Sequence, residues 1–126
     1  MAGERILIVD DNATNLKLAK VILAKEGYEV QTAADAEEAL RCLGQAKPGL
    51  ILMDLQLPGM DGLELTRELK AAPATKDIVI VALTAFAMKG DEEKARAAGC
   101  DGYITKPIDT LKLPAQVAGY LTGEPR

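Results

Sequence analysis

The chain has 126 residues, which suits one domain with its own hydrophobic core and leaves too little for two ordinary domains. Hydrophobic residues make up 48% of it and charged residues 27%, a balance typical of soluble globular proteins that excludes a disordered chain. The net charge of −4 argues against nucleic acid or an anionic membrane as the main partner. We therefore expect a single domain over residues 1–126.

Cysteine usage and hydropathy indicate a cytoplasmic protein. Cys42 and Cys100 are too few for a disulfide scaffold and lack the spacing of a metal site, so we expect both to be reduced and buried. No apolar stretch approaches the length needed to cross a bilayer, and no signal peptide precedes the first apolar run.

The first apolar run, Ile6–Val9, predicts a strand, and a helical pattern closed by Gly27 follows it. The apolar stripe of that helix consists of Leu16, Ala19, Ile22 and Leu23. The next run, Glu29–Ala33, alternates between polar and apolar residues and predicts a strand at a sheet edge. A second helix follows, with Asp35 and Glu38 placed as a capping-box pair.

The rest of the chain repeats this alternation of strand and helix. Three further strands are expected at Leu50–Met53, Ile78–Leu83 and Gly102–Ile104. The first two are apolar throughout, as strands covered on both faces are. The helical stretch 88–99 has mostly alanine at its apolar positions, so it buries little area and predicts a face of low local stability; a plain solvated helix is the alternative.

The last helix steps by fours through Leu113, Val117 and Leu121, and Pro114 fits only in its first turn. Strands and helices in strict alternation predict a parallel sheet. The fold class is therefore α/β, a three-layer α/β/α sandwich.

Polar residues follow four of the five predicted strands. Asp10 and Asp11 come after the first, Asp54 after the third, Thr84 after the fourth and Lys106 after the fifth. Because parallel strands end at one edge of a sheet, and open α/β sheets bind ligands there, we expect these side chains to share one site.

Three carboxylates in one site need a cation. At a separation of about 4 Å each pair repels by roughly 1 kcal/mol in water, and by several at protein-like dielectric. The chain has no histidine and no clustered cysteine, which argues against zinc, whereas carboxylate oxygens suit Mg²⁺. Because Mg²⁺ in proteins keeps positions for water and phosphate oxygens, this pattern predicts phosphoryl chemistry.

Each of these residues also has a simpler interpretation. Asp11 or Asn12 could cap the first helix, which is the usual role of such residues there. Asp54 could belong to a turn, Thr84 could cap the next helix, and Lys106 could be a solvated charge. The functional interpretation depends on all of them meeting at one edge of the sheet.

Two other kinds of site fit less well. The stretch DDNATN imitates the start of a calcium loop, but Asn15 replaces the required glycine and Val21 the bidentate glutamate. A phosphohydrolase with an aspartate nucleophile places a general acid two residues after it, and Gln56 in that position cannot transfer a proton. No glycine-rich nucleotide motif follows the first strand.

Four motifs of the chain resemble the receiver domain of bacterial two-component response regulators. They are LIVDDN, LILMDLQLPGMDG, VALTAFA and YITKPI, and the resemblance extends from Ile6 to about Leu121. The stretch TAFAMKGDEEKARAAGC looks most like single-domain regulators of the chemotaxis or cell-division type and receivers of hybrid histidine kinases. The resemblance implies a five-stranded sheet in the flavodoxin-like order 2-1-3-4-5.

The resemblance also implies a role for each polar residue. Asp54 would take a phosphoryl group from a phosphohistidine of a histidine kinase or a histidine phosphotransfer protein. Lys106 and Thr84 would contact the phosphoryl oxygens. Mg²⁺ would be held by Asp10, Asp11, Asp54 and the backbone carbonyl of Gln56. The chain has no histidine of its own, so a partner must supply the phosphohistidine.

Signalling in the family implies a switch. Thr84 would move toward the phosphoryl group, and Tyr103 would turn into the vacated space, changing a face made by the fourth helix, fifth strand and fifth helix for a downstream effector. From the residues alone, Tyr103 is an ordinary edge-strand aromatic. Gln56 and Phe86 would control water access, and Lys106–Pro107 would carry a cis peptide bond.

Catalysis by such a domain is limited to its own phosphorylation and slow hydrolysis of the product. One alternative keeps the same fold but not the chemistry, namely a docking module that works without phosphorylation.

Overall fold

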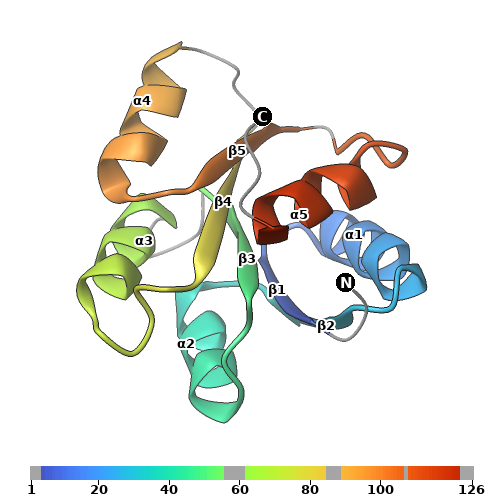
Figure 1. The fold of residues 1–126 in the computed structure, drawn as a ribbon, viewed down its shortest axis with the longest axis horizontal. Helices are drawn as coiled ribbons and strands as arrows, with labels where there is room; N and C mark the ends of the chain where they lie inside the picture. The colour runs from blue at the N-terminus through green and yellow to red at the C-terminus, as the bar shows by residue number, and fades with distance from the viewer. Residues whose placement is uncertain (1–3, 56–61, 85–88, 107, 123–126) are drawn as a thin grey trace.

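Five parallel strands form one sheet in the order β2-β1-β3-β4-β5 (Figure 1). They are Arg5–Val9 (β1), Glu29–Ala33 (β2), Leu50–Asp54 (β3), Val79–Thr84 (β4) and Gly102–Thr105 (β5). The structure, a computed structural model, describes residues 4–55, 62–84, 89–106 and 108–122. All five predicted strands are confirmed to within one residue at either end, and so is the predicted strand order.

Helices cover both faces of the sheet, which confirms the three-layer prediction. They are Ala13–Lys25 (α1), Ala36–Gln45 (α2), Gly62–Ala71 (α3), Lys89–Ala98 (α4) and Leu113–Thr122 (α5). Figure 1 shows α1 and α5 on one side of the sheet, and α2, α3 and α4 on the other. Helix α4 contacts α3 and β5.

The central strands bury side chains on both faces because successive residues of a strand point to opposite sides. One core cluster joins the sheet to α1 and α5 through Ile6, Ile8, Leu50, Leu52, Leu23 and Val117. The other joins it to α2 and α3 through Leu7, Val9, Ile51, Met53, Ala39 and Leu65. The continuous apolar runs of the sequence thus correspond to strands packed on both sides, as predicted.

The first helix begins and ends at residues that the sequence marks. The cap of α1 is Asn12, whose Oδ1 accepts the N–H of Asn15 at 3.0 Å, so of the two candidate caps Asp11 is not the one. The helix ends at Lys25, and Gly27 then adopts a φ of 94°, which glycine reaches without strain.

The predicted capping box of α2 is present with one change. Asp35 Oδ1 accepts the N–H of Glu38 at 2.8 Å, as expected. The Glu38 carboxylate, however, accepts the N–H of Ala34 at 2.7 Å, one residue before the cap. In α5, Pro114 is the second residue, within the first turn as predicted.

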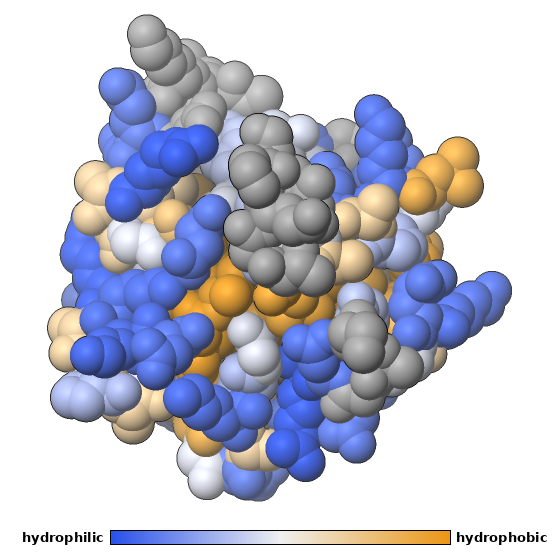
Figure 2. Space-filling model, viewed as in Figure 1, coloured by the Kyte–Doolittle hydropathy of each residue, from blue (hydrophilic) through white to orange (hydrophobic). Residues whose placement is uncertain are grey.

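The cysteines and the hydropathy of the helices can be compared with the expectations from the sequence. Cys42 and Cys100 are free thiols, and both are half-buried where full burial was expected. Among the described residues, no helix is both long and apolar enough to cross a membrane. Hydrophilic residues cover most of the outer helix surfaces in Figure 2, and hydrophobic residues show mainly toward the middle of that view.

Candidate functional site

The carboxyl ends of β1, β3, β4 and β5 bring the predicted site residues to one edge of the sheet. Asp10 and Asp11 directly follow β1, and Asp54 is the last residue of β3. Thr84 is the last residue of β4, and Lys106 comes directly after β5. These residues come together because the strands are parallel, so that all their carboxyl ends lie at the same edge of the sheet.

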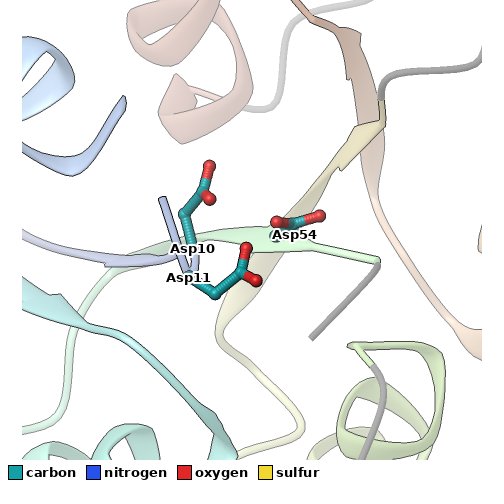
Figure 3. Close-up of side chains that lie close together, drawn as sticks. All are labelled: Asp10, Asp11 and Asp54. Atoms are coloured by element: carbon teal, nitrogen blue, oxygen red, sulfur yellow. The ribbon is translucent and has the colours of Figure 1, made fainter. Parts of the chain in front are cut away.

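The three aspartates form a compact cluster of carboxylates (Figure 3). One oxygen of each lies within 4.8 Å of the others. Asp10 is completely buried, Asp54 is 4% exposed and Asp11 is exposed, so the cluster has a dry side and a side open to solvent. Figure 3 shows the Asp11 carboxylate directed toward Asp54.

Lys106 supplies a positive charge to the buried side of the cluster. Its Nζ lies 2.9 Å from Oδ2 of Asp10 and 3.0 Å from Oδ2 of Asp54, and its side chain is 16% exposed. Burial by itself would lower the pKa of Lys106, but its hydrogen bonds to both carboxylates and their negative charges together outweigh burial and raise the pKa above the ordinary value. Lys106 is therefore a charged, bound ammonium group and not a solvated surface charge.

The cap residue and the first turn of α1 also hold the Asp10 carboxylate. The N–H of Asn12 donates to Oδ1 at 2.9 Å, and the Asn15 side chain donates to Oδ2 at 3.4 Å. The Asp10 N–H donates to the carbonyl of Ala33 on β2 at 3.0 Å. Sequence reasoning missed both α1 donors. The available signal was the Asp-x-Asn spacing, since an aspartate commonly accepts the N–H two residues on.

Gly62 is a further site residue that sequence reasoning missed. It begins α3, and its N–H donates to the carbonyl of Leu55 at 3.3 Å. A Cβ at this position would overlap the carbonyl oxygen of Asp54 and lie 2.9 Å from the Asp54 carbonyl carbon. Only glycine therefore lets α3 start against the backbone that carries the Asp54 side chain.

Thr84 and Tyr103 lie on the two strands at the β5 side of the site. Thr84 is 5% exposed, and its carbonyl accepts the N–H of Lys106 at 2.7 Å. Tyr103 is half-buried and stands opposite Ala82 in the register of β4 and β5. Its N–H donates to the hydroxyl of Tyr120 on α5 at 3.4 Å.

Some expectations fall outside the described residues. They are the Gln56 carbonyl as a metal ligand, Gln56 and Phe86 as controls of water access, the Lys106–Pro107 peptide, and the turn after Asp54.

The ligand set fits a hard divalent cation. The cluster offers carboxylate oxygens only, and one member lies open to solvent where waters can complete the coordination. Mg²⁺ prefers oxygen ligands and usually keeps several waters, so Asp10, Asp11 and Asp54 suit it. Lys106 already neutralises part of the negative charge of Asp10 and Asp54, so a bound cation would interact with the same two carboxylates as the ammonium.

Comparisons with a family model, with known relatives and with solved structures all identify the same family. The family model described as the response regulator receiver domain matches residues 6–118. The polar-differentiation response regulator DivK of Brucella anthropi is 43% identical over 116 residues, which are 92% of this chain and 94% of that protein.

Solved structures of several receivers have the same fold. A putative response regulator from Chloroflexus aurantiacus superposes with a TM-score of 0.90 at 33% identity, over 95% of this chain and 98% of that one. The receiver domain of a sensor histidine kinase from Pseudomonas aeruginosa, whose structure has a magnesium ion coordinated in the active site cleft, gives a TM-score of 0.86 at 36% identity, over 96% and 99%. With an acidic cluster at the expected edge of a 2-1-3-4-5 sheet, the chain belongs to the receiver domains of two-component response regulators.

Proposed function

We propose that Asp54 accepts a phosphoryl group from a phosphohistidine of a partner histidine kinase or histidine phosphotransfer protein. Mg²⁺ would be bound by Asp10, Asp11, Asp54 and the backbone carbonyl of Gln56. The observation that carries the proposal is the Lys106 ammonium bonded to both Asp10 and Asp54 within a cluster of three carboxylates. Receiver domains in general bind Mg²⁺ and work with such kinases, and this arrangement supports the same chemistry here.

A carboxylate oxygen of Asp54 forms a bond to phosphorus while the phosphorus–nitrogen bond of the donor breaks, and the imidazole takes a proton. Bound Mg²⁺ would neutralise charge on the transferred oxygens. Lys106 would turn from Asp54 Oδ2 to a phosphoryl oxygen, and its raised pKa keeps it protonated for that role. Thr84 would donate its hydroxyl to another phosphoryl oxygen.

The phosphoryl group would then change the surface that an effector binds. It adds a charge approaching −2 and three acceptor oxygens. We propose that Thr84 moves toward it, that Tyr103 follows into the vacated space, and that the α4–β5–α5 face changes for a downstream partner. The position of Tyr103 on β5, with its backbone bonded to α5, supports this route.

Two further points belong to this proposal. The domain would catalyse only its own phosphorylation and a slow hydrolysis of the acyl phosphate. The free thiols of Cys42 and Cys100 support a location in the reducing cytoplasm.

Intact-mass measurement tests phosphorylation. The chain is incubated with Mg²⁺ and phosphoramidate, a small donor with the phosphorus–nitrogen bond of phosphohistidine. We expect a gain of one phosphoryl group that a chelator abolishes and that Asp54→Asn abolishes. Asp77→Asn, which removes an exposed carboxylate outside the site, should leave the gain intact. No gain under conditions that modify another receiver would favour the docking module that works without phosphate.

Substitution of Thr84 tests the route from site to surface. Thr84→Ala should still be phosphorylated, but affinity for the effector should respond less to phosphorylation than in the wild type. If partner affinity stays equally sensitive, the proposed coupling through Thr84 and Tyr103 is wrong.

A further inference from the structure

The stretch that imitates a calcium loop, DDNATN, contains an asparagine that the proposed function does not use. Asn15 lies in the first turn of α1, and its N–H is bonded to the capping Oδ1 of Asn12 at 3.0 Å. Its backbone is therefore held at the start of the helix, and its side chain donates to Oδ2 of the fully buried Asp10 at 3.4 Å.

Both oxygens of Asp10 thus accept a hydrogen bond, one from the cap residue of α1 and one from its first turn. Oδ1 accepts the N–H of Asn12 at 2.9 Å, and Oδ2 accepts the amide of Asn15. Among the described residues, the one other donor to Oδ2 is Lys106, at 2.9 Å. Two donors on the same helix turn fix the plane of a carboxylate, because each oxygen is held separately.

The two donors to Oδ2 differ in whether they move when Asp54 is phosphorylated. Lys106 bonds both Asp54 and Asp10 Oδ2, and when its ammonium turns to a phosphoryl oxygen, as proposed above, we expect its bond to Asp10 to be weakened as well. Asn15 stays in place, because its backbone is part of the helix cap. A buried carboxylate oxygen that loses its donor is costly, so a second donor makes the departure of Lys106 easier. The Asn15 bond is long while Lys106 shares the same oxygen, and we expect it to shorten afterwards.

We propose that Asn15 is a positioning residue for the metal site: it orients the Asp10 carboxylate toward the cation and keeps Oδ2 hydrogen-bonded when Lys106 turns away. Only the second role, keeping Oδ2 hydrogen-bonded when Lys106 turns away, rests on the proposed function. The first role, orienting Asp10, affects Mg²⁺ binding whether or not Asp54 is phosphorylated.

Mg²⁺ titration of the full chain, followed by backbone amide NMR signals, tests the inference. Asn15→Ala should weaken Mg²⁺ binding about tenfold, within the range usual for partners of metal ligands. Thr14→Ala, an exposed neighbour in the same helix turn, should leave the Kd unchanged. In an Asp10→Ala background, Asn15→Ala should have almost no further effect, since its action runs through Asp10.

Thermal unfolding separates this role from a plain contribution to the helix. If Asn15 only supports the start of α1, Asn15→Ala lowers Tm equally in EDTA and in Mg²⁺, and the proposal is wrong. The proposal expects the stabilisation by Mg²⁺ to shrink, because that stabilisation depends on the Kd. An unchanged Kd, an equal loss in both Asp10 backgrounds, or a wild-type chain that binds no Mg²⁺ would each overturn it. A wild-type chain that binds Mg²⁺ but takes no phosphoryl group would refute the proposed function and leave the role of Asn15 in metal binding intact.

Discussion

The ammonium of Lys106 lies 3.0 Å from Oδ2 of Asp54, across the ends of β5 and β3. The group proposed to assist transfer is thus already bonded to the carboxylate proposed to receive the phosphoryl group. The ammonium balances the charge of carboxylates that a cation would bind, and it lies where a phosphoryl group on Asp54 would be placed.

Removing the Lys106 charge should strengthen Mg²⁺ binding while destabilising the metal-free chain. Lys106→Met removes the ammonium that is bonded to the buried Asp10 and Asp54, which should cost about 2–4 kcal/mol of unfolding free energy in EDTA. The cation no longer shares these carboxylates with an ammonium, so its affinity should rise about tenfold. Urea unfolding with and without Mg²⁺ measures both effects. Lys112→Met, at an exposed lysine, is the control, and an equal loss in both conditions would contradict the account.

Neutralising Asp11 should have the opposite effect on the metal-free chain. Asp11 is exposed and adds a like charge to the cluster, so Asp11→Asn relieves repulsion and should raise Tm in EDTA by about 2–4 °C. The increase should fade at high salt, because exposed charges are screened. The same variant should lose most of its stabilisation by Mg²⁺. A lower Tm in EDTA would mean that Asp11 has a structural role that the cluster geometry does not include.

Glycine at the start of α3 should prove necessary for the site. Gly62→Ala forces the added Cβ against the Asp54 backbone and should cost about 1–3 kcal/mol while weakening Mg²⁺ binding. Gly44→Ala, inside α2 with open space around it, should be neutral or stabilising by up to ~1 kcal/mol. Chemical unfolding of both variants compares the two positions. Equal effects would mean that the close approach at Gly62 relaxes easily.

Gly102 and Tyr120 should be coupled. The Tyr120 ring lies on Gly102, so that a Cβ there would be 2.5 Å from Cζ and 2.9 Å from Cδ1 of the ring. Gly102→Ala should therefore cost about 2 kcal/mol in the wild type and clearly less in a Tyr120→Ala background, where the ring is absent. A double-mutant cycle in urea measures the difference. Additive effects would show that the ring moves aside without cost.

Stability should fall at alkaline pH partly through Cys100. Burial raises the pKa of its thiol to about 11. The unfolded thiol ionises first, so the contribution of Cys100 is fully present below pH 9 and is lost as pH rises toward 11, by about 2 kcal/mol. The stability difference between wild type and Cys100→Ala should therefore shift by this amount over that range. A constant difference would contradict the burial of the thiol.

The fold was largely predictable because its determinants are local and repetitive. Continuous apolar runs at Leu50–Met53 and Ile78–Leu83 predict strands covered on both faces, and the structure has them. The edge position of β2 follows from its alternating pattern. The shared edge for Asp10, Asp54 and Lys106 follows from parallel strand direction alone, with no knowledge of side-chain contacts.

The contacts inside the site were not predictable in the same way. The hydrogen bonds of Asn12 and Asn15 to Asp10 depend on how the first turn of α1 folds back over the strand end. The need for glycine at Gly62 arises from the distance between α3 and the Asp54 backbone. Likewise, the carboxylate of Glu38 bonds Ala34 and not the cap residue because of the local chain path. Such details depend on tertiary distances, which residue spacing does not encode.

Localisation of the phosphoryl group tests the central claim most directly. After incubation with phosphoramidate and Mg²⁺, borohydride reduction converts an aspartyl phosphate to homoserine, and peptide mass spectrometry identifies the converted residue. The account predicts homoserine at position 54 alone, with none in EDTA or without the donor. Homoserine at Asp10 or Asp11, or a phosphoryl group that resists borohydride and maps to Thr84, would contradict it.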